Sequence, residues 1–193
     1  IAPFYDAAIA GATSVPRARS LAWLAPHPPL DVLLAGGGTG LDLPLLPAQH
    51  RYVGLDLTPA MLRRCGPRAG GRLFAPVQGN AMGLPFGAAS FDAVVLHLIL
   101  AVVPQPLDCL REATRVLRPG GTLLVFDKFL RPGQRAWLRR LATPLAGRIA
   151  TRLDVVLEDL VPHVPGLRLE HDEPALAGGW FRLIRLRRAS SLA

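Results

Sequence analysis

The chain is 193 residues long and half of its residues are apolar, which suits one well-packed domain and excludes a disordered or low-complexity chain. A formal charge of +8 and a pI near 11.1 favour acidic partners such as nucleic acid or anionic lipid. This charge has a competing explanation, because Lys128 is the only lysine and genome base composition can produce such an arginine bias without a functional demand.

The sequence predicts no membrane span, disulfide or metal site. The longest apolar run, residues 93–103, is interrupted by His97 and is far shorter than the roughly 20 residues that cross a bilayer. Cys65 and Cys109 lie far apart and have no ligand pattern around them, which fits a reducing compartment. The chain opens with IAPFYD, without a starting Met or a signal-type segment, so we expect a cytoplasmic protein and leave the completeness of its N-terminus open.

Short aliphatic strands alternate with helical segments, a pattern typical of a parallel sheet with helices on both faces. The helix after the second strand has Thr58 as its N-cap and Pro59 in its first turn. The helix of residues 107–117 has apolar residues at helical spacing and ends at RPGG. The predicted strands are residues 31–35, 51–55, 72–77, 91–98, 122–127, 167–170 and 180–188, and further helices are predicted to begin at 41–46 and around 153–160.

The first predicted strand ends in GGGTG and leads into a predicted helix. Several backbone N–H groups are therefore expected at a positive helix terminus, with no Cβ to keep a ligand away. Gly36, Gly38 and Gly40 are spaced G-x-G-x-G, whereas the dinucleotide pattern G-x-G-x-x-G needs its third glycine at Leu41. Asp56 follows the second strand, where a carboxylate can accept both hydroxyls of a ribose. The alternative is a tight turn, with Asp56 as a helix cap.

Four segments, in this order, resemble the class I S-adenosylmethionine-dependent methyltransferases of type 11. They are LLAGGGTG, YVGLDLTPAML, VQGNAMGLPFGAASFDAVV and RVLRPGGTLLVFD. The resemblance implies an α/β fold, with a Rossmann-like, seven-stranded, mostly parallel sheet whose last strand is antiparallel and with helices on both faces. It also implies one domain over residues 1–193 and S-adenosyl-L-methionine as the cofactor.

The resemblance assigns parts of the cofactor to particular residues. The three glycines approach the methionine and ribose portions, and Asp56 holds the ribose hydroxyls. Asn80 stands where the family often has Asp, and its amide oxygen can still accept from the exocyclic amine of adenine. Tyr5, with Asp6, resembles an element that folds over the cofactor, and a disordered leader is the alternative. The implied cofactor-binding residues are Tyr5, Ala35, Gly36, Gly38, Gly40, Asp56, Leu57, Met61, Asn80, Ala81 and His97.

One position departs from the family pattern. The first motif usually carries an acidic residue two positions before its first glycine, and this residue helps to anchor the cofactor's ammonium. This chain has Leu34 there, and Asp31 is expected to point to the opposite face of the strand. Either another group supplies the contact, or the protein is a non-catalytic cofactor-binding module on the same fold. A nicotinamide dehydrogenase is a third reading, disfavoured by the glycine spacing and by the lack of a Tyr-x-x-x-Lys pair.

Methyl transfer from a sulfonium is an in-line displacement that depends mainly on positioning, and a base matters only when the acceptor must lose a proton. No N-P-P-Y-type motif follows the fourth strand, which makes nucleic acid an improbable acceptor. His97, near the end of that strand, is the candidate base or orienting group, and the alternative is a core histidine bonded to the backbone. Asp127 and Lys128 end the fifth strand on the same rim, where they contact an acceptor, or form a local ion pair or an exposed turn.

Residues 131–152 alternate arginines with apolar residues, which predicts a basic amphipathic insert. Such a segment suits peripheral contact with an anionic membrane at the inner surface, and a solvated helix face over the core is the alternative. The continuation LAVVPQP and the closing GGWFRLIRLRR resemble the bacterial phospholipid N-methyltransferases and related quinone enzymes. We therefore expect a small-molecule or lipid-like methyl acceptor.

Overall fold

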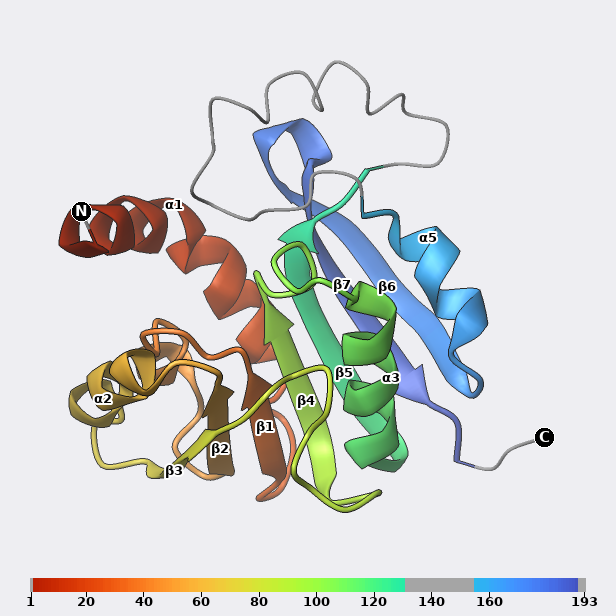
Figure 1. Ribbon diagram of the computed structural model, residues 1–193, viewed down its shortest axis with the longest axis horizontal. Helices are drawn as coiled ribbons and strands as arrows, with labels where there is room; N and C mark the ends of the chain where they lie inside the picture. The colour runs from red at the N-terminus through yellow and green to blue at the C-terminus, as the bar shows by residue number, and fades with distance from the viewer. Residues whose placement is uncertain (1, 131–154, 191–193) are drawn as a thin grey trace.

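Seven strands form one sheet in the order β3-β2-β1-β4-β5-β7-β6 (Figure 1). The structure is a computed structural model that describes residues 2–130 and 155–190, with side chains from residue 11 onward. β1 to β5 pair in parallel, and β7 pairs antiparallel with both β5 and β6. The predicted sheet with its antiparallel last strand is confirmed. The strands are Asp31–Ala35 (β1), Arg51–Asp56 (β2), Leu73–Gln78 (β3), Phe91–His97 (β4), Leu117–Lys128 (β5), Leu167–Leu176 (β6) and Phe181–Arg188 (β7).

Helices cover both faces of the sheet, as predicted (Figure 1). On one face, Leu21 and Cys65 pack in a single apolar cluster with alternate residues of β1 and β4. On the other face, Leu110 and Leu157 pack in a larger cluster with the intervening residues of the strands. The helices are α1 (Ala2–Ala22), α2 (Pro59–Arg68), α3 (Pro106–Val116) and α5 (Leu157–Leu160), the first two contributing to the smaller cluster and the last two to the larger.

The sequence analysis predicted no helix for the region of α1. Its two alternatives for the start of the chain were an element that folds over the cofactor and a disordered leader. Gly11 and Pro16 both lower the intrinsic helix propensity of this segment. Packing compensates, since Leu21 and Leu24 are buried against the sheet at the end of the helix. α1 therefore lies over the carboxyl end of the sheet's middle strands (Figure 1).

The helix predicted to begin at 41–46 is wrong, because the chain makes only one 3-10 turn there, Leu43–Leu45. Pro44 and Pro47 lack the N–H donors that an α-helix needs, so the segment cannot propagate. The positive helix terminus expected after the glycine loop is consequently missing.

Two strands are longer than the sequence pattern indicates. β5 begins at Leu117, so RPGG lies inside the strand instead of before it. β6 extends to Leu176 along the edge of the sheet, where exposed charged residues hide the strand pattern. The basic insert predicted at 131–152 lies outside the described residues. Within the described residues, no helix is long and apolar enough to cross a membrane.

Candidate functional site

The candidate site lies at the carboxyl ends of β1 and β4, in the middle of the sheet. β1 is flanked by β2 on one side and by β4 on the other, so the order of connection reverses between β1 and β4. In open α/β sheets such a switch point opens a crevice in which ligands bind. The glycine loop, the end of β2 and the loop after β4 meet at this edge.

The three glycines of the loop have different structural roles. All three have positive φ values: 72° at Gly36, 54° at Gly38 and 79° at Gly40. A Cβ at Gly36 would lie 2.1 Å from Cδ1 of Ile99, and one at Gly40 would lie 3.2 Å from the Cα of Cys65. A Cβ at Gly38 would meet nothing within 4 Å. Gly36 and Gly40 are therefore needed for packing, and Gly38 alone leaves open space in which a ligand can approach the backbone.

Three side chains from β2 and α2 hold the loop in place. The N–H of Gly38 donates to Oδ2 of Asp56 at 2.9 Å. The Cys65 thiol donates to the carbonyl oxygen of Gly38 at 3.3 Å, and burial raises the pKa of this thiol, which keeps the donor proton in place. Arg68 donates to both the carbonyl and the hydroxyl oxygen of Thr39, at 2.7 and 2.8 Å. Sequence reasoning identified Asp56 but missed Cys65 and Arg68, which the structure brings to the loop from the following helix.

The residues expected to face adenine lie around the end of β2 and the loop after β3. Leu57 is 67% exposed and Met61 is half-buried, so each has apolar surface free for a ligand. Asn80 is exposed, and its side-chain oxygen accepts from the N–H of Met82 at 2.9 Å. Ala81 is buried in the larger core cluster, so only its backbone can face a ligand.

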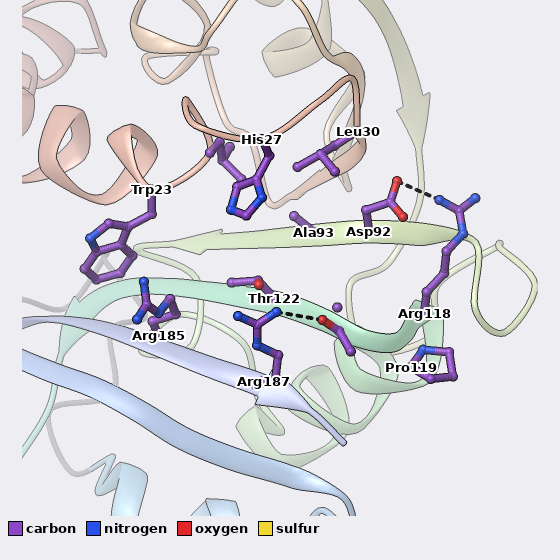
Figure 2. Close-up of a pocket in the computed structure, with 13 residues that line it drawn as sticks. Trp23, His27, Leu30, Asp92, Ala93, Arg118, Pro119, Thr122, Arg185 and Arg187 are labelled. Carbon is purple, nitrogen blue, oxygen red and sulfur yellow. Dashed lines mark hydrogen bonds and ion pairs between the residues drawn. The ribbon is translucent and has the colours of Figure 1, made fainter. Parts of the chain in front are cut away.

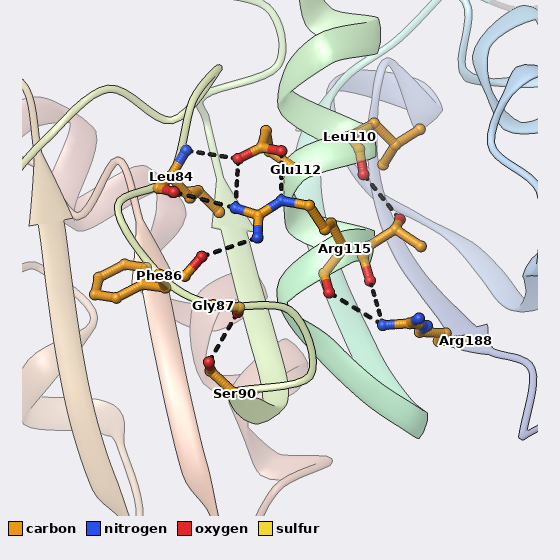
Figure 3. Close-up of polar contacts among 9 residues, drawn as sticks. Leu84, Phe86, Gly87, Ser90, Leu110, Glu112, Arg115 and Arg188 are labelled. Atoms are coloured by element: carbon orange, nitrogen blue, oxygen red, sulfur yellow. Dashed lines mark hydrogen bonds and ion pairs between the residues drawn. The ribbon is translucent and has the colours of Figure 1, made fainter.

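Two residues of α3 anchor this loop to the rest of the fold. Glu112 accepts from the N–H of Leu84 at 2.7 Å, and Arg115 donates to the carbonyl oxygens of Phe86 and Leu84 (Figure 3). The Arg115 guanidinium beside Glu112 lowers the pKa of that carboxyl, so the pair stays charged. Sequence reasoning did not select this pair, and the signal that could have found it is an acid and a base three positions apart on one predicted helix.

His97, the predicted base or orienting group, is buried and has both ring nitrogens in internal hydrogen bonds. Nδ1 lies 2.9 Å from Oδ1 of Asp42, and Nε2 lies 3.0 Å from Oγ of Ser20. The geometry therefore resembles the alternative of a core histidine, except that its partners are side chains instead of backbone. In this arrangement neither nitrogen is free to take a proton from an acceptor, and only the orienting role fits.

Asp42 is the centre of this buried cluster, and sequence reasoning did not select it. Its Oδ1 also accepts from Nη1 of Arg17 at 2.7 Å, and Nε of Arg17 donates to Thr13 at 3.0 Å. Burial by itself would raise the pKa of Asp42, but His97 and Arg17 more than offset it and hold this pKa well below its usual range. Asp42 is therefore a carboxylate at neutral pH. No pattern in LDLPLL signals this, because both partners are distant in sequence.

Asp127 is buried at the end of β5 and forms no exposed turn. Its carboxylate accepts from the N–H of Lys128 at 2.8 Å and from that of Ala101 at 3.1 Å, which joins β5 to the loop after β4. Burial raises the pKa of Asp127 to about 6, although these hydrogen bonds oppose the shift. Burial also lowers the pKa of Lys128, whose charge adjoins the carboxylate. The Asp127 carboxylate therefore fixes the loop after β4 against the end of β5.

Two further predictions concern the side chain of Tyr5 and a metal site. Tyr5 lies in α1, and its side chain is outside the described part of the chain, so its contact with a cofactor stays a prediction. Among the described residues, no group of three or more His, Cys, Asp or Glu side chains could hold a metal ion.

A separate pocket of about 200 Å³ lies at the opposite end of the strands, near the starts of β4 and β5 (Figure 2). Its arginines already have partners: Arg118 pairs with Asp92, and Arg187 donates to the carbonyl oxygen of Gly120. The guanidinium of Arg185 lies 5.3 Å from the ring centroid of Trp23. This pocket is remote from the glycine loop and is not part of the candidate site.

Known proteins resemble this chain in sequence. Residues 33–125 match the family model described as a methyltransferase domain. The chain is 29% identical over 189 residues to a phosphatidylethanolamine N-methyltransferase of Cereibacter sphaeroides, covering 95% of this chain and 92% of the relative. It is 40% identical over 113 residues to a ubiquinone/menaquinone biosynthesis C-methyltransferase of Ruegeria sp. (strain TM1040), covering 54% of this chain and 45% of the relative. The chain thus matches less than half of this second relative.

Solved structures share the fold. A candidate methyltransferase from Bacillus halodurans superposes with a TM-score of 0.76 at 19% identity, covering 90% of this chain and 98% of the other. The [4+2]-cyclase SpnF superposes with a TM-score of 0.71 at 16% identity, covering 90% and 81%. A cyclase on this fold illustrates that the fold by itself does not define a reaction.

The fold is that of the methyltransferase structures it resembles, and the family model matches the part of the chain that contains the glycine loop and the acid after it. The methyltransferase-domain match over residues 33–125 and the relatives named as methyltransferases support an S-adenosylmethionine-dependent methyltransferase, with S-adenosyl-L-methionine as the cofactor. The methyl acceptor is a separate question, because the two relatives named above act on different molecules according to their names.

Proposed function

We propose that the crevice at the switch point binds S-adenosylmethionine and that the protein transfers its methyl group to the amine of a phospholipid of the phosphatidylethanolamine type. The cofactor half of this proposal depends mainly on one observation, the hydrogen bond between the N–H of Gly38 and Asp56 beside the open space at Gly38. This bond brings a carboxylate and an unobstructed backbone together at the ligand-binding edge of the sheet.

The residues present fit the cofactor. Each oxygen of Asp56 accepts one backbone N–H, from Gly38 and from Thr58, and keeps a lone pair for a ribose hydroxyl. Leu57 and Met61 offer apolar surface to the adenine ring, and the backbone at Asn80 and Ala81 faces its edge. Gly38 leaves its backbone open to the methionine and ribose portions, and Ala35, Gly36 and Gly40 are the other loop residues expected on that side. When bound, the cofactor supplies an electrophilic methyl group on a sulfonium.

A phospholipid amine is favoured over a quinone by the extent of similarity. The match to the phosphatidylethanolamine enzyme spans 92% of that relative, whereas the match to the quinone enzyme spans 45% of it. Residues 131–152, which lie outside the described residues, have the arginine and apolar pattern of a segment that rests on an anionic bilayer. We propose that they bring the protein to the inner membrane surface as a peripheral protein.

The chemistry asks little of the protein beyond positioning. The bound cofactor would supply the methyl group to the amine lone pair and would keep the electrons of the carbon–sulfur bond on sulfur, and the alkylated nitrogen would release a proton to solvent. The chain's part is to hold the nitrogen in line with the breaking bond and to exclude water. Asp127 contributes indirectly, because it fixes the loop after β4 against β5.

The direct test is transfer of a labelled methyl group from S-adenosylmethionine to vesicles that contain phosphatidylethanolamine. Label is expected in monomethylated and dimethylated lipid, and more of it when the vesicles also carry an anionic lipid. Vesicles of phosphatidylcholine, which has no methylatable amine, are the matched control. Labelling of a demethylated quinone in place of the lipid amine would instead indicate that the acceptor is a quinone.

A non-catalytic module on the same fold was the alternative suggested by Leu34. Neither the family match nor the relatives support it, because those relatives are named as methyltransferases. Binding of S-adenosylmethionine without transfer to any amine or quinone would revive it.

A further inference from the structure

The pocket near the starts of β4 and β5 is a cavity that the methyltransferase site does not use (Figure 2). Its volume of about 200 Å³ is below the usual range of pockets for drug-sized ligands, so it suits a small ligand. One wall is a bulge in β5, where residues 118–121 lie opposite Asp92 alone. Trp23 and His27, which follow α1, form another side. The pocket is therefore built from the sheet and from the segment that leaves α1.

Two arginines of β7 line this pocket and keep donors that no described residue uses. Arg185 and Arg187 are two residues apart, so both side chains lie on the face of the sheet that α1 covers. Arg187 donates from Nε to Glu170 and from Nη1 to the carbonyl oxygen of Gly120, each at 2.9 Å, and its Nη2 has no acceptor among the described residues. Arg185 makes no hydrogen bond to any described residue, although its Nε is fully buried.

One carboxylate and one aromatic ring hold the two guanidinium groups in place. Glu170 lies 3.2 Å from Nε of Arg185, at ion-pair distance, and accepts from Nε of Arg187. Both contacts use the Nε side of the guanidinium, so both Nη groups of Arg185 stay available. The ring centroid of Trp23 lies 5.3 Å from the guanidinium carbon of Arg185, a contact that orients this group without using its N–H donors.

The surroundings of these arginines carry excess positive charge. Glu170 is shared by the two arginines of β7, so these three residues have a net charge of +1. Arg168 of β6 stands directly opposite Arg187, and like charges in that position destabilise an antiparallel pair. Arg118 adds nothing to the excess, because it pairs with two carboxylates of its own. An anion in the pocket would offset this repulsion in a partly desolvated place, where the gain is larger than in open solvent.

The donors suit an oxyanion with several oxygens. Thr122 of β5 lies directly opposite Arg187 in the register of the two strands, and its hydroxyl bonds to no other described residue. This hydroxyl and the free N–H groups of both arginines border one hollow (Figure 2). A carboxylate offers two oxygens to such a set, whereas a phosphate offers three or four, and arginine binds phosphate with paired N–H groups. We propose that the pocket is a second ligand site, in which Arg185, Arg187 and Thr122 bind a phosphate group.

This site goes beyond the proposed methyl transfer and does not depend on it. The pocket is remote from the glycine loop, and none of its residues belongs to the crevice at the switch point. A bound phosphate connects α1 to the sheet, because Trp23 packs on the arginine that holds it. The phosphate is either the free ion or the terminal group of a small monoester, since both present the same oxygens.

Calorimetric titration with inorganic phosphate tests the site, with ionic strength held constant by sodium chloride. Arg185→Met and Arg187→Met are each expected to weaken phosphate about 10- to 100-fold, through the loss of charge-assisted hydrogen bonds. Arg185→Lys keeps the charge without the paired donors and should give an intermediate loss. The matched control is Arg51→Met, which removes an exposed arginine at the same end of the sheet that pairs with Asp31 outside the pocket. It should change the affinity by no more than about twofold.

A second titration with glycerol 3-phosphate identifies the source of the phosphate. Tighter binding of inorganic phosphate would assign the site to the free ion, and tighter binding of glycerol 3-phosphate would assign it to a small monoester. Either result supports the site if the two methionine variants weaken the binding. Failure of both ligands to bind the unmodified protein, or equal binding by the unmodified protein and the Arg185→Met variant, would overturn it.

Two further measurements keep this site separate from loss of structure and from the cofactor crevice. Thermal unfolding without ligand should give Arg185→Met nearly the melting temperature of the unmodified protein, because Arg185 makes no hydrogen bond to a described residue. Titration with S-adenosylmethionine should be unaffected by phosphate and by both variants. Competition between phosphate and S-adenosylmethionine would overturn the second site and leave the proposed function standing. Absence of S-adenosylmethionine binding, with the phosphate results as expected, would do the reverse.

Discussion

The backbone N–H of Gly38 and the side chain of Asp56 are joined by a 2.9 Å hydrogen bond between the ends of two adjacent parallel strands. This bond fixes the carboxylate beside the one glycine of the loop that has open space at its Cβ position. The positions of the carboxylate and of the bare backbone relative to each other are thereby set before any ligand binds. Preorganisation of this kind reduces the cost of binding.

Replacement of Asp56 tests the ribose contact. Asp56→Ala is expected to weaken S-adenosylmethionine and 5′-methylthioadenosine alike by roughly 10- to 100-fold, because both contain the same ribose diol. Calorimetric titration with each nucleoside measures the effect. Asp92→Asn, which alters a half-buried carboxylate at the opposite end of the sheet, should change neither affinity. Equal affinities for the Asp56→Ala variant and the unmodified protein would remove the ribose role.

The glycines of the loop are expected to differ when each is replaced by alanine. Gly38→Ala should cost only about 1 kcal/mol of unfolding free energy, from its positive φ, and should lower cofactor affinity more than tenfold because the new Cβ enters the open space. Gly40→Ala should cost roughly 2–4 kcal/mol, because its Cβ also collides with Leu43 and Cys65. Urea unfolding and nucleoside titration measure the two quantities. A larger loss of stability at Gly38 than at Gly40 would contradict the assigned roles.

His97→Gln is expected to lower the melting temperature of the protein, because it disturbs the hydrogen bonds to Asp42 and Ser20 that connect β4 with α1. Turnover at saturating cofactor should fall only modestly if His97 has an orienting role. Thermal unfolding and steady-state methyl transfer measure the two effects. A large loss of turnover with an unchanged melting temperature would instead support the predicted role as a base.

The buried carboxyl of Asp127 is expected to make the unfolding free energy depend on pH. Its pKa in the folded protein is about 6, above the ordinary value of 3.8, so the folded state binds this proton more tightly than the unfolded chain. Its contribution to stability is therefore complete below about pH 4 and is lost as the pH rises through 6. The unfolding free energy of the unmodified protein, relative to Asp127→Asn, should decline over this range in urea titrations. A carboxyl ¹³C titration of Asp127 with a midpoint near 4 would contradict the burial argument.

Much of the sheet could be predicted, because its signals are local. Aliphatic runs such as residues 31–35 and 91–97 form buried parallel strands at nearly the predicted bounds. The helix opening at Thr58 and Pro59 begins where its N-terminal signals indicate. β6 was predicted too short, because an edge strand with one exposed face carries charges that weaken the hydrophobic pattern.

The helix at the start of the chain was harder to predict, because its stability comes from contacts and not from propensity. Pro16 and Gly11 argue against a helix, while burial of Leu21 and Leu24 against the sheet favours it. The reverse holds after the glycine loop, where an apparently helical run of leucines makes a single turn because of Pro44 and Pro47.

The amino-acid sequence by itself determined the alternation of strands and helices, the glycine loop and the acid that follows the next strand. These depend on backbone preferences and on the spacing of residues along a short stretch of chain. Only the tertiary structure decided that Gly38 is the open glycine, that both nitrogens of His97 are bonded internally, and that Asp42 and Arg17 stand together. The reason is physical: a charged side chain takes its partner from whichever element the packing of the core brings within reach, and that partner can be any distance away along the chain.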